Sequence, residues 1–351
     1  MTRGTAIDFG RGVAVVRING RFSVRIGLRV LTVVLVLLGL TAAVAVLALG
    51  TGEYTIAPGE VLRAIFGTAS RKVELVVNEW RMPRVLLAIM LGAALGASGA
   101  IFQSLTRNPL GSPDIIGFNT GSYTGALVVI LFTNGGYYQT ALGALVGGIA
   151  TAAVVYVLAF RHGVQGFRLI IVGIAISAML HSMNVWLIIK VDLAAAMTAA
   201  VWGSGSLSGL HVAQVVPVAV ALPVLLTCAV LLAYRIPVLD LGDDAARALG
   251  IRAEPTRLGL VMVGVGLTAL ATAAAGPIAF VSLAAPQLAR RLTKTSSVAV
   301  LPAAAMGALL LVTADLLAQR VFSPTQLPVG VVTVSIGGGY FVWLLAREVR
   351  R

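Results

Sequence analysis

Long apolar stretches recur along this chain, each close to the roughly 20 residues that an α-helix needs to cross the hydrocarbon core of a bilayer. Nine are long enough, at roughly 28–50, 85–105, 114–133, 139–160, 168–190, 213–234, 257–275, 299–320 and 328–346. A shorter apolar piece at 277–289 is ambiguous, so the chain has ten spans if this piece crosses and nine if it does not. Because 58% of the residues are hydrophobic and 11% are charged, a soluble globule is excluded. The sequence predicts an all-α polytopic membrane protein.

The distribution of basic residues favours ten transmembrane helices. With ten spans and a cytoplasmic N-terminus, 19 of the 26 Lys and Arg residues lie on the cytoplasmic side, in agreement with the positive-inside rule. With nine spans, the C-terminal arginines Arg347, Arg350 and Arg351 would face outward. We therefore expect both termini in the cytoplasm and the following organisation: an N-terminal tail at 1–29, one transmembrane domain at 30–347 with a cytoplasmic segment at 235–257, and a C-terminal tail at 348–351.

Several kinds of chemistry are absent from the sequence. The net charge of +13 comes from basic residues in short loops and tails beside apolar spans, so membrane topology explains it without a nucleic-acid partner. A phosphate-binding loop needs Gly-Lys-Ser/Thr, but none of Lys72, Lys190 and Lys294 follows a glycine. Neither zinc-ligand spacing nor a catalytic triad is present, and a single cysteine, Cys228, excludes a CxxC site. We expect no catalytic residue, no metal site and no cofactor bound directly.

Two ionisable residues, His181 and Asp315, fall inside predicted spans. Ionisable residues within a membrane often belong to proton or sodium relays, so a stand-alone secondary transporter is one alternative. Neither residue has a second charge within one helical turn, and Arg320 follows Asp315 by five residues. A hydrogen bond between packed helices is the simpler interpretation for each.

A short amphipathic helix is predicted at 240–250, between the sixth and seventh spans. Acidic residues at its start suit the positive end of the helix dipole, and Gly250 suits a left-handed C-cap. The helix is either an ordinary capped loop or a handle that a partner binds. Its apolar face comprises Leu241, Ala245, Ala248 and Leu249, and its polar face comprises Asp243, Asp244 and Arg247.

Three further patterns concern helix packing and helix ends. Gly92, Gly96 and Ala100, spaced four apart, predict close helix contact along the second span. Ser112-Pro113-Asp114 predicts an N-cap and first turn for the third span. Gly276-Pro277 breaks the helix after the seventh span. The short helix that follows must be buried in protein or line a cavity, because lipid cannot satisfy its free backbone groups.

Four blocks, in order, resemble the FecCD-like permeases of type II ABC importers, which carry iron-siderophores, haem or vitamin B12. The resemblance extends from about residue 53 to the C-terminus and implies the ten-helix permease fold of that family. The blocks are Arg81-Met-Pro-Arg84 with Gly92 to Gly99, Gln103, Arg107-Asn108-Pro109-Leu110, Pro113 and Gly117; Leu241-Gly-Asp-Asp244 with Ala248-Leu-Gly250; Gly276-Pro277 to Pro286 with Arg290; and Leu327-Pro-Val-Gly-Val-Val-Thr333.

The resemblance implies a subunit that does not hydrolyse ATP itself and is driven by separate ABC ATPase subunits that use ATP and Mg²⁺. Two permease copies, or this chain and a related permease, would form a central path that opens alternately outward and inward. In the family, the segment after the sixth span docks on the ATPase. The resemblance assigns this role to Leu241, Gly242, Asp243, Asp244, Ala245, Arg247, Ala248, Leu249 and Gly250.

The resemblance also implies an extracytoplasmic substrate-binding protein, with Arg81 and Arg84 receiving its acidic residues. Arg320 is a weaker docking candidate, because Gln319 occupies the position that aligns with the family's further arginine. We expect an iron(III)-siderophore permease of the bacterial cytoplasmic membrane, with haem or cobalamin as alternative cargo and a non-transporting receptor as another class. The residues expected to serve helix packing or the pathway are Gly92, Gly96, Gly99, Asn108, Pro109, Gly276, Pro277 and Pro286.

Overall fold

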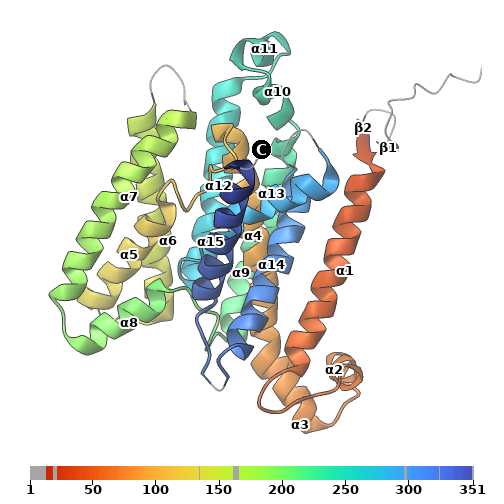
Figure 1. Ribbon diagram of the computed structural model, residues 1–351, viewed down its shortest axis with the longest axis vertical. Coiled ribbons are helices and arrows are strands. Elements are labelled where there is room, and N and C mark those ends of the chain that lie inside the picture. Colours follow the sequence, from red (N-terminus) through yellow and green to blue (C-terminus); the bar gives the residue numbers. More distant parts are fainter. Residues whose placement is uncertain are drawn as a thin grey trace, which may run out of the picture.

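The computed structural model describes most of the chain, namely residues 13–18, 22–133, 135–160, 166–295, 299–323 and 325–349. Most of these residues are helical, and the long helices run side by side along one axis of the molecule (Figure 1). The outer parts of the two predicted tails, 1–12 and 350–351, lie outside the described residues.

Each of the ten predicted spans corresponds to a helix within the described residues. Seven are long and apolar enough to cross a membrane: α1 (Leu28–Gly50), α4 (Met82–Thr106) with the turns that lead into it, α6 (Tyr137–Ala159), α7 (Gly166–Ile189), α9 (Val212–Ala233), α12 (Ala253–Ala275) and α14 (Val300–Arg320). The other three are α5 (Phe118–Thr133), α13 (Val281–Thr293) and α15 (Val329–Val349). The predicted helical membrane fold is therefore confirmed.

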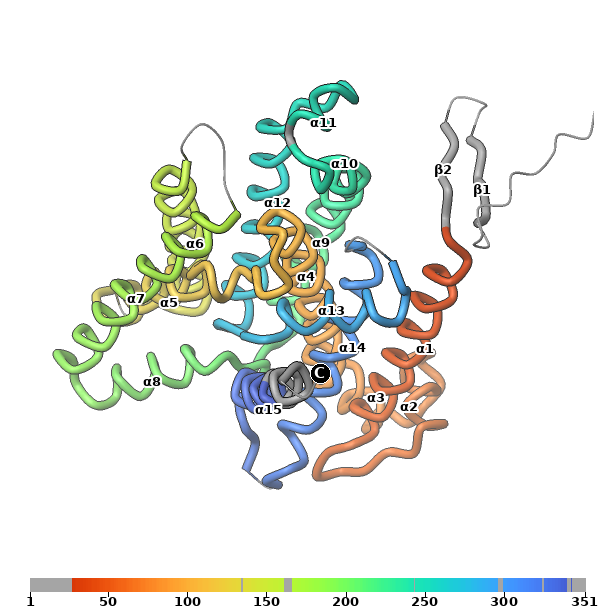
Figure 2. Tube along the Cα trace, turned by 45° about the horizontal axis from the view of Figure 1, so that its top comes forward, coloured from red at the N-terminus to blue at the C-terminus, as the bar shows by residue number. Residues whose placement is uncertain are grey.

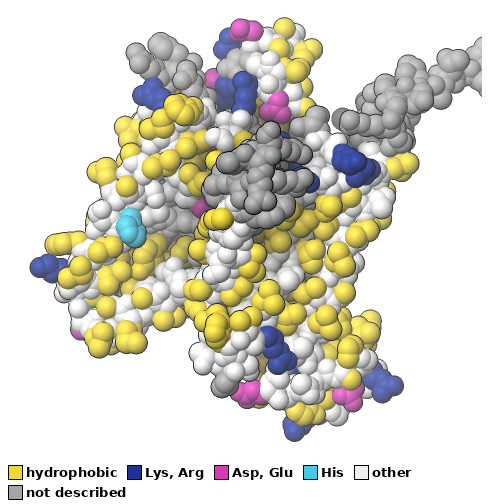
Figure 3. Space-filling view, viewed as in Figure 1, with side chains coloured by type: hydrophobic (Ala, Val, Ile, Leu, Met, Phe, Trp, Pro, Cys, Tyr) yellow, Lys and Arg dark blue, Asp and Glu magenta, His cyan; other side chains and the backbone are white. Residues whose placement is uncertain are grey.

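Short helices occupy the two ends of the bundle. At one end lie α2 (Pro58–Ile65), α3 (Arg71–Glu74) and a π-helical stretch, η1 (Leu75–Arg81), that continues into α4. At the other end, α10 (Ile236–Asp240) and α11 (Asp243–Ala248) project beyond the long helices (Figure 1). A further helix, α8 (Leu193–Gly203), follows α7. On the face seen in Figure 3, charged side chains gather mainly near the two ends, and hydrophobic ones cover the middle.

The region before α1 departs from the all-α expectation. Two strands, β1 (Val13–Ile18) and β2 (Phe22–Gly27), pair antiparallel with Val16 opposite Val24. Residues 13–16 are Val-Ala-Val-Val, and β-branched residues favour strands. The predicted N-terminal tail thus contains a β-hairpin at the same end of the molecule as α10 and α11 (Figure 1).

Helix α4 forms the centre of the bundle and packs against α9, α12, α13 and α14. Its predicted small-residue stripe faces α14: a methyl group at Gly92 would overlap the backbone of Gly307, and one at Gly96 would overlap Ala303. Further along α4, Gly99 lies directly against Ser282 of α13. Small residues therefore allow the backbones of three helices to approach one another closely.

The third span begins later than the Ser112-Pro113-Asp114 pattern predicts. Helix α5 starts at Phe118 and has 16 residues, and the irregular segment that precedes it is largely buried. The predicted N-cap at Ser112 is therefore wrong, because a turn at 113–117 separates it from the first residue of α5. In this turn, the Asp114 carboxylate accepts hydrogen bonds from the start of α13. Helix α5 then packs closely on α6, with Gly125 against Gly143 and Gly147 against Gly121.

Candidate functional site

The predicted helix at 240–250 is shorter in the structure: α11 covers Asp243–Ala248, and Leu241 and Gly242 separate it from α10, which ends at Asp240. Gly242 has φ +109° and Gly250 has φ +78°, backbone conformations that a residue with a side chain rarely adopts. After the helix, Gly250 N–H donates to Arg247 O and Ile251 N–H donates to Ala246 O. The chain therefore leaves α11 through a left-handed turn at Gly250.

Helix α11 presents an apolar edge to its surroundings. Leu241 and Leu249 are 68% and 64% exposed, and Ala248 is exposed as well. The opposite side is anchored by Ala246, which is fully buried. The exposed Asp244 and Arg247 form an ion pair of 3.4 Å along the helix. An anchored helix with two exposed leucines at its ends is suited to binding another protein.

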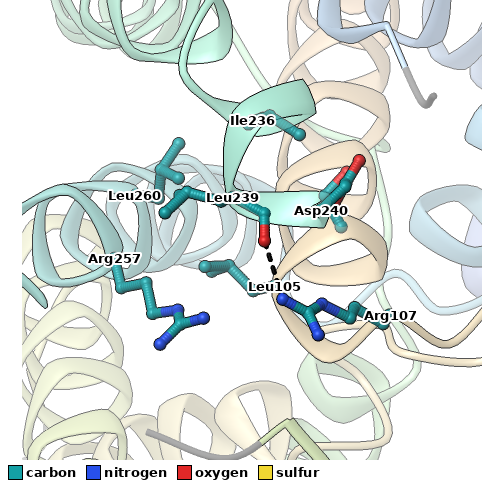
Figure 4. A pocket seen from close by; sticks show the side chains of 8 residues that line it. Leu105, Arg107, Ile236, Leu239, Asp240, Arg257 and Leu260 are labelled. Carbon is teal, nitrogen blue, oxygen red and sulfur yellow. Dashed lines mark hydrogen bonds between the residues drawn. The ribbon is translucent and has the colours of Figure 1, made fainter. Parts of the chain in front are cut away.

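The base of this segment is fixed to the bundle at a water-sized pocket between α4, α10 and α12 (Figure 4). Arg107, at the C-terminal end of α4, has a left-handed backbone (φ 49°) and donates an Nη2 hydrogen bond of 2.7 Å to Leu239 O. Desolvation raises the pKa of the neighbouring Asp240 carboxyl, and the positive charge of Arg107 lowers it in part. The last turn of α10 is thereby held against the end of α4.

At the opposite end of the molecule, Arg84 is engaged in an internal ion pair. Its Nε and Nη2 donate to both carboxylate oxygens of Asp315 in α14 at 2.9–3.1 Å, and its Nη1 donates to Gln326 Oε1 at 2.7 Å. Gln319 donates to the same carboxylate. The Arg84 side chain is 13% exposed and that of Asp315 is 2% exposed. All three guanidinium nitrogens of Arg84 therefore bind groups of this chain.

The other two arginines considered for docking lie nearer the surface. Arg81 donates to Leu49 O at 2.8 Å and to Tyr54 O at 2.7 Å, which fixes the loop that follows α1. Arg320, at the end of α14, is exposed. Arg81 and Arg84 border a pocket of about 400 Å³ at this end of the bundle that also includes Glu53, Trp80, Gln319 and Gln326.

The helix ends at Gly276-Pro277, as predicted, and this interruption between α12 and α13 is enclosed by protein. Gly276 has φ +75° and lies against Trp202 O, and Ser206 N–H donates to Ala275 O at 2.8 Å. The short helix α13 that follows contains the buried Pro286. Gln103 of α4 donates to Leu283 O of α13 at 3.0 Å, so a second helix also holds it in place.

This architecture is shared with known proteins. A model of the FecCD transport family matches residues 40–347. This chain belongs to the FecCD transport family.

Relatives match this FecCD chain along nearly its whole length. The ferric enterobactin transport system permease protein FepG of Escherichia coli (strain K12) is 49% identical over 323 residues, covering 92% of this chain and 98% of FepG. The probable siderophore transport system permease protein YfhA of Bacillus subtilis (strain 168) is 39% identical, covering 90% and 94%. A solved inward-facing metal-chelate type ABC transporter has a TM-score of 0.81 at 26% identity, covering 90% of this chain and 99% of that chain.

Two buried acids of this FecCD chain have roles that the sequence alone did not indicate. Asp315 pairs with Arg84, whereas His181 is exposed on α7, so the two residues considered as a relay lie on different helices and Asp315 is already bound. Asp114 binds the start of α13. Asn108 accepts a hydrogen bond from Leu110 N–H at 2.9 Å, and Pro109 between them is exposed, so this motif forms a tight turn after α4.

Proposed function

We propose that this chain is the membrane permease subunit of an ATP-driven importer that moves an iron(III)-siderophore across the bacterial cytoplasmic membrane. The observation that carries the proposal is the 49% identity to a ferric enterobactin permease over nearly the whole of both chains. Relatives named for hydroxamate and citrate chelates of iron support the same cargo class over haem or cobalamin. The subunit works without a cofactor of its own.

The end of the bundle that carries α10 and α11 is proposed to face the cytoplasm. Arginines gather there, which agrees with the positive-inside rule; among the described ones are Arg107, Arg235, Arg247, Arg252, Arg257, Arg290 and Arg291. The two ends of the chain are then cytoplasmic, and α2 and α3 lie on the outer side. Lipid covers the exposed apolar sides of the long helices.

A separate ABC ATPase subunit, which uses ATP and Mg²⁺, is proposed to bind α11. The exposed Leu241, Ala248 and Leu249 would enter a groove of that subunit, and Asp244 and Arg247 would lie at the rim. Movement of α11 reaches the membrane domain through α10, whose Leu239 carbonyl accepts a hydrogen bond from Arg107. Gly242, Asp243, Ala245 and Gly250 set the shape of this segment.

An extracytoplasmic substrate-binding protein is proposed to dock at the outer end, beside the pocket that Arg81 borders. Arg81 and the exposed Arg320 would attract acidic side chains of that protein and set its orientation. Arg84 contributes from beneath, because it ties Gln326, in the loop between α14 and α15, to α4 and α14.

A second permease, identical or related, is proposed to cover the α7 side of the bundle. Along its 24 residues, α7 buries only Leu169, Gly173 and Asn184 and exposes His181 and Ser182. Polar side chains within a span avoid lipid and face protein or a water-filled path. Figure 2 shows that α7 and α8 lie at one side of the molecule. Two such sides facing each other would enclose a central path.

Reconstituted transport tests this function. Proteoliposomes containing the permease, its ATPase and its binding protein should take up radiolabelled ferric enterobactin or another ferric siderophore only with ATP, and should not take up cobalamin or haem. An ATPase subunit that binds but cannot hydrolyse ATP provides the control. Uptake that continues without ATP and follows a proton gradient would instead identify a secondary transporter.

A further inference from the structure

The start of α13 is held by a carboxylate from another part of the chain. Asp114 Oδ2 accepts hydrogen bonds from Phe280 N–H at 3.1 Å and from Ser282 Oγ at 2.7 Å, and Asp114 Oδ1 accepts one from Asn119 Nδ2 at 2.9 Å. Asn119 Oδ1 in turn accepts a hydrogen bond of 3.1 Å from Thr272 of α12. The segment before α5 is thereby connected to both sides of the break between α12 and α13.

Phe280, the residue at this junction, has a strained backbone. Its φ of +68° lies in the left-handed region, which is unfavourable for a bulky side chain. Such a conformation persists only where its surroundings hold it, and the hydrogen bond from its N–H to Asp114 is one such restraint. The direction of the Phe280 side chain is therefore fixed by the backbone and by Asp114 together.

The Phe280 ring fills a notch on α15. A methyl group added to Gly337 would overlap this ring, whereas methyl groups at Gly338 and Gly339 would meet no atom within 4 Å. One helical turn to either side of Gly337, α15 carries Thr333 and Phe341. A shift of α15 by one turn would bring a larger residue against the ring, so the notch accepts Phe280 at one register.

We propose that Phe280, restrained by Asp114 and seated on Gly337, is a fixed joint that makes α13 and α15 move as one body. In this arrangement Phe280 and Gly337 are positioning residues, and changes of shape occur elsewhere in the bundle. Two experiments test this proposal. The packing test is independent of what the chain transports, and only the movement test rests on the importer function proposed above.

The packing test compares neighbouring glycines in the purified permease. Alanine in place of an unhindered helical glycine ordinarily raises stability, because glycine loses more backbone freedom on folding. Gly338→Ala should therefore match or exceed the wild-type melting temperature, whereas Gly337→Ala should lower it or prevent purification. Adding Phe280→Gly to Gly337→Ala should restore a stable protein, because it removes both the ring and the Phe280 Cβ that the new methyl group would meet. A Gly337→Ala protein as stable as Gly338→Ala would overturn the joint.

The movement test measures the distance between α13 and α15 during the transport cycle. Leu292→Cys on α13 and Ile336→Cys on α15, both at exposed positions, are introduced together with Cys228→Ala, which removes the native cysteine, and both new cysteines carry nitroxide spin labels. If α13 and α15 move as one body, the distance between the two labels should be the same without nucleotide and with ATP and vanadate.

A change in the distance between the two labels when ATP and vanadate are added would mean that α13 and α15 move apart during transport, and the joint would be refuted. If the wild-type chain fails to transport any ferric siderophore, the importer proposal fails, while the melting temperatures of the glycine variants still decide whether Phe280 is seated on Gly337.

Discussion

Arg84, a docking candidate in the sequence, forms an ion pair inside the fold. Its guanidinium makes a two-pronged pair with Asp315, and both side chains are largely buried. Desolvating two charges is costly, so such a pair is weak evidence for net stability, but removing one partner leaves the other charge uncompensated. The pair therefore matters most when it is broken.

Breaking this pair should destabilise the protein. We expect Arg84→Ala to cost about 3 kcal/mol, because it leaves the Asp315 carboxylate buried without its cation. The double variant Arg84→Ala with Asp315→Ala should recover part of that loss, and Arg320→Ala, at an exposed arginine, should change stability by less than about 0.5 kcal/mol. Melting temperatures in detergent provide the measurement; equal values for the single and double variants would contradict the pairing.

Arg81 and Arg320 lie nearer the surface than Arg84 does, so we expect reversal of their charges to affect docking. Arg81→Glu combined with Arg320→Glu is expected to slow association of the binding protein, and the effect should shrink as salt is raised, because exposed charges mainly steer encounter. Surface plasmon resonance at low and high salt measures it, with Arg63→Glu on α2 as a control at the same end. Unchanged association at low salt would remove Arg81 and Arg320 from the docking surface.

Pairings of this kind could not be predicted from the sequence, because they join residues far apart in the chain. Arg84 and Asp315 are separated by 231 positions, and Asp114 and Ser282 by 168. The Ser-Pro-Asp pattern before α5 suggested a local helix start, but the Asp114 carboxylate binds the distant start of α13. One signal was available: charges within the membrane pair with one another, and Arg84 and Asp315 lie near the same end of neighbouring spans.

At the scale of elements, the segment comprising α10 and α11 combines a fixed base with an exposed tip. Arg107 holds the base, and Leu241 and Leu249 are exposed at the tip. A fixed base is what allows a push on the tip to move the bundle rather than merely bend the loop. This arrangement favours force transmission over a passive connection.

Replacing the exposed leucines should weaken binding of the proposed ATPase subunit to the permease while preserving the permease fold. Each buried leucine side chain is worth about 1.5–3 kcal/mol, so Leu241→Ser with Leu249→Ser should weaken ATPase binding at least tenfold. Leu62→Ser, at an exposed position on α2 at the other end, provides the control. Co-purification and transport measure the effect; tight binding by the double variant would show that the ATPase binds elsewhere.

The spans were predictable from the sequence, because hydropathy over 20 residues reports directly on burial in lipid. The capped segment and the helix break at Gly276-Pro277 were also predictable, because glycine allows backbone conformations that other residues avoid and proline removes a backbone hydrogen-bond donor, and both effects are local. The start of α5 was not, because residues 112–117 are buried by neighbouring helices that the local sequence does not reveal.

At the scale of the whole molecule, the distribution of basic residues predicts the orientation of the chain in the membrane. In a Cys228→Ala background, a membrane-impermeant maleimide should label Glu60→Cys on α2 from outside intact cells. Asp244→Cys on α11 should be labelled only after the membrane is opened. Both positions are exposed, so access to the reagent depends on the side of the membrane. The reverse pattern would invert the proposed topology.

The short helix α5 also bears on how the protein is made. A helix of 16 residues rises about 24 Å, less than the roughly 30 Å hydrocarbon core, so α5 is a weak insertion signal by itself. Its glycine-lined face matches that of α6, which follows after a very short connection. During synthesis α5 would therefore enter the bilayer together with α6, as a preformed helical hairpin, and the order of insertion would follow pairs of helices rather than single spans.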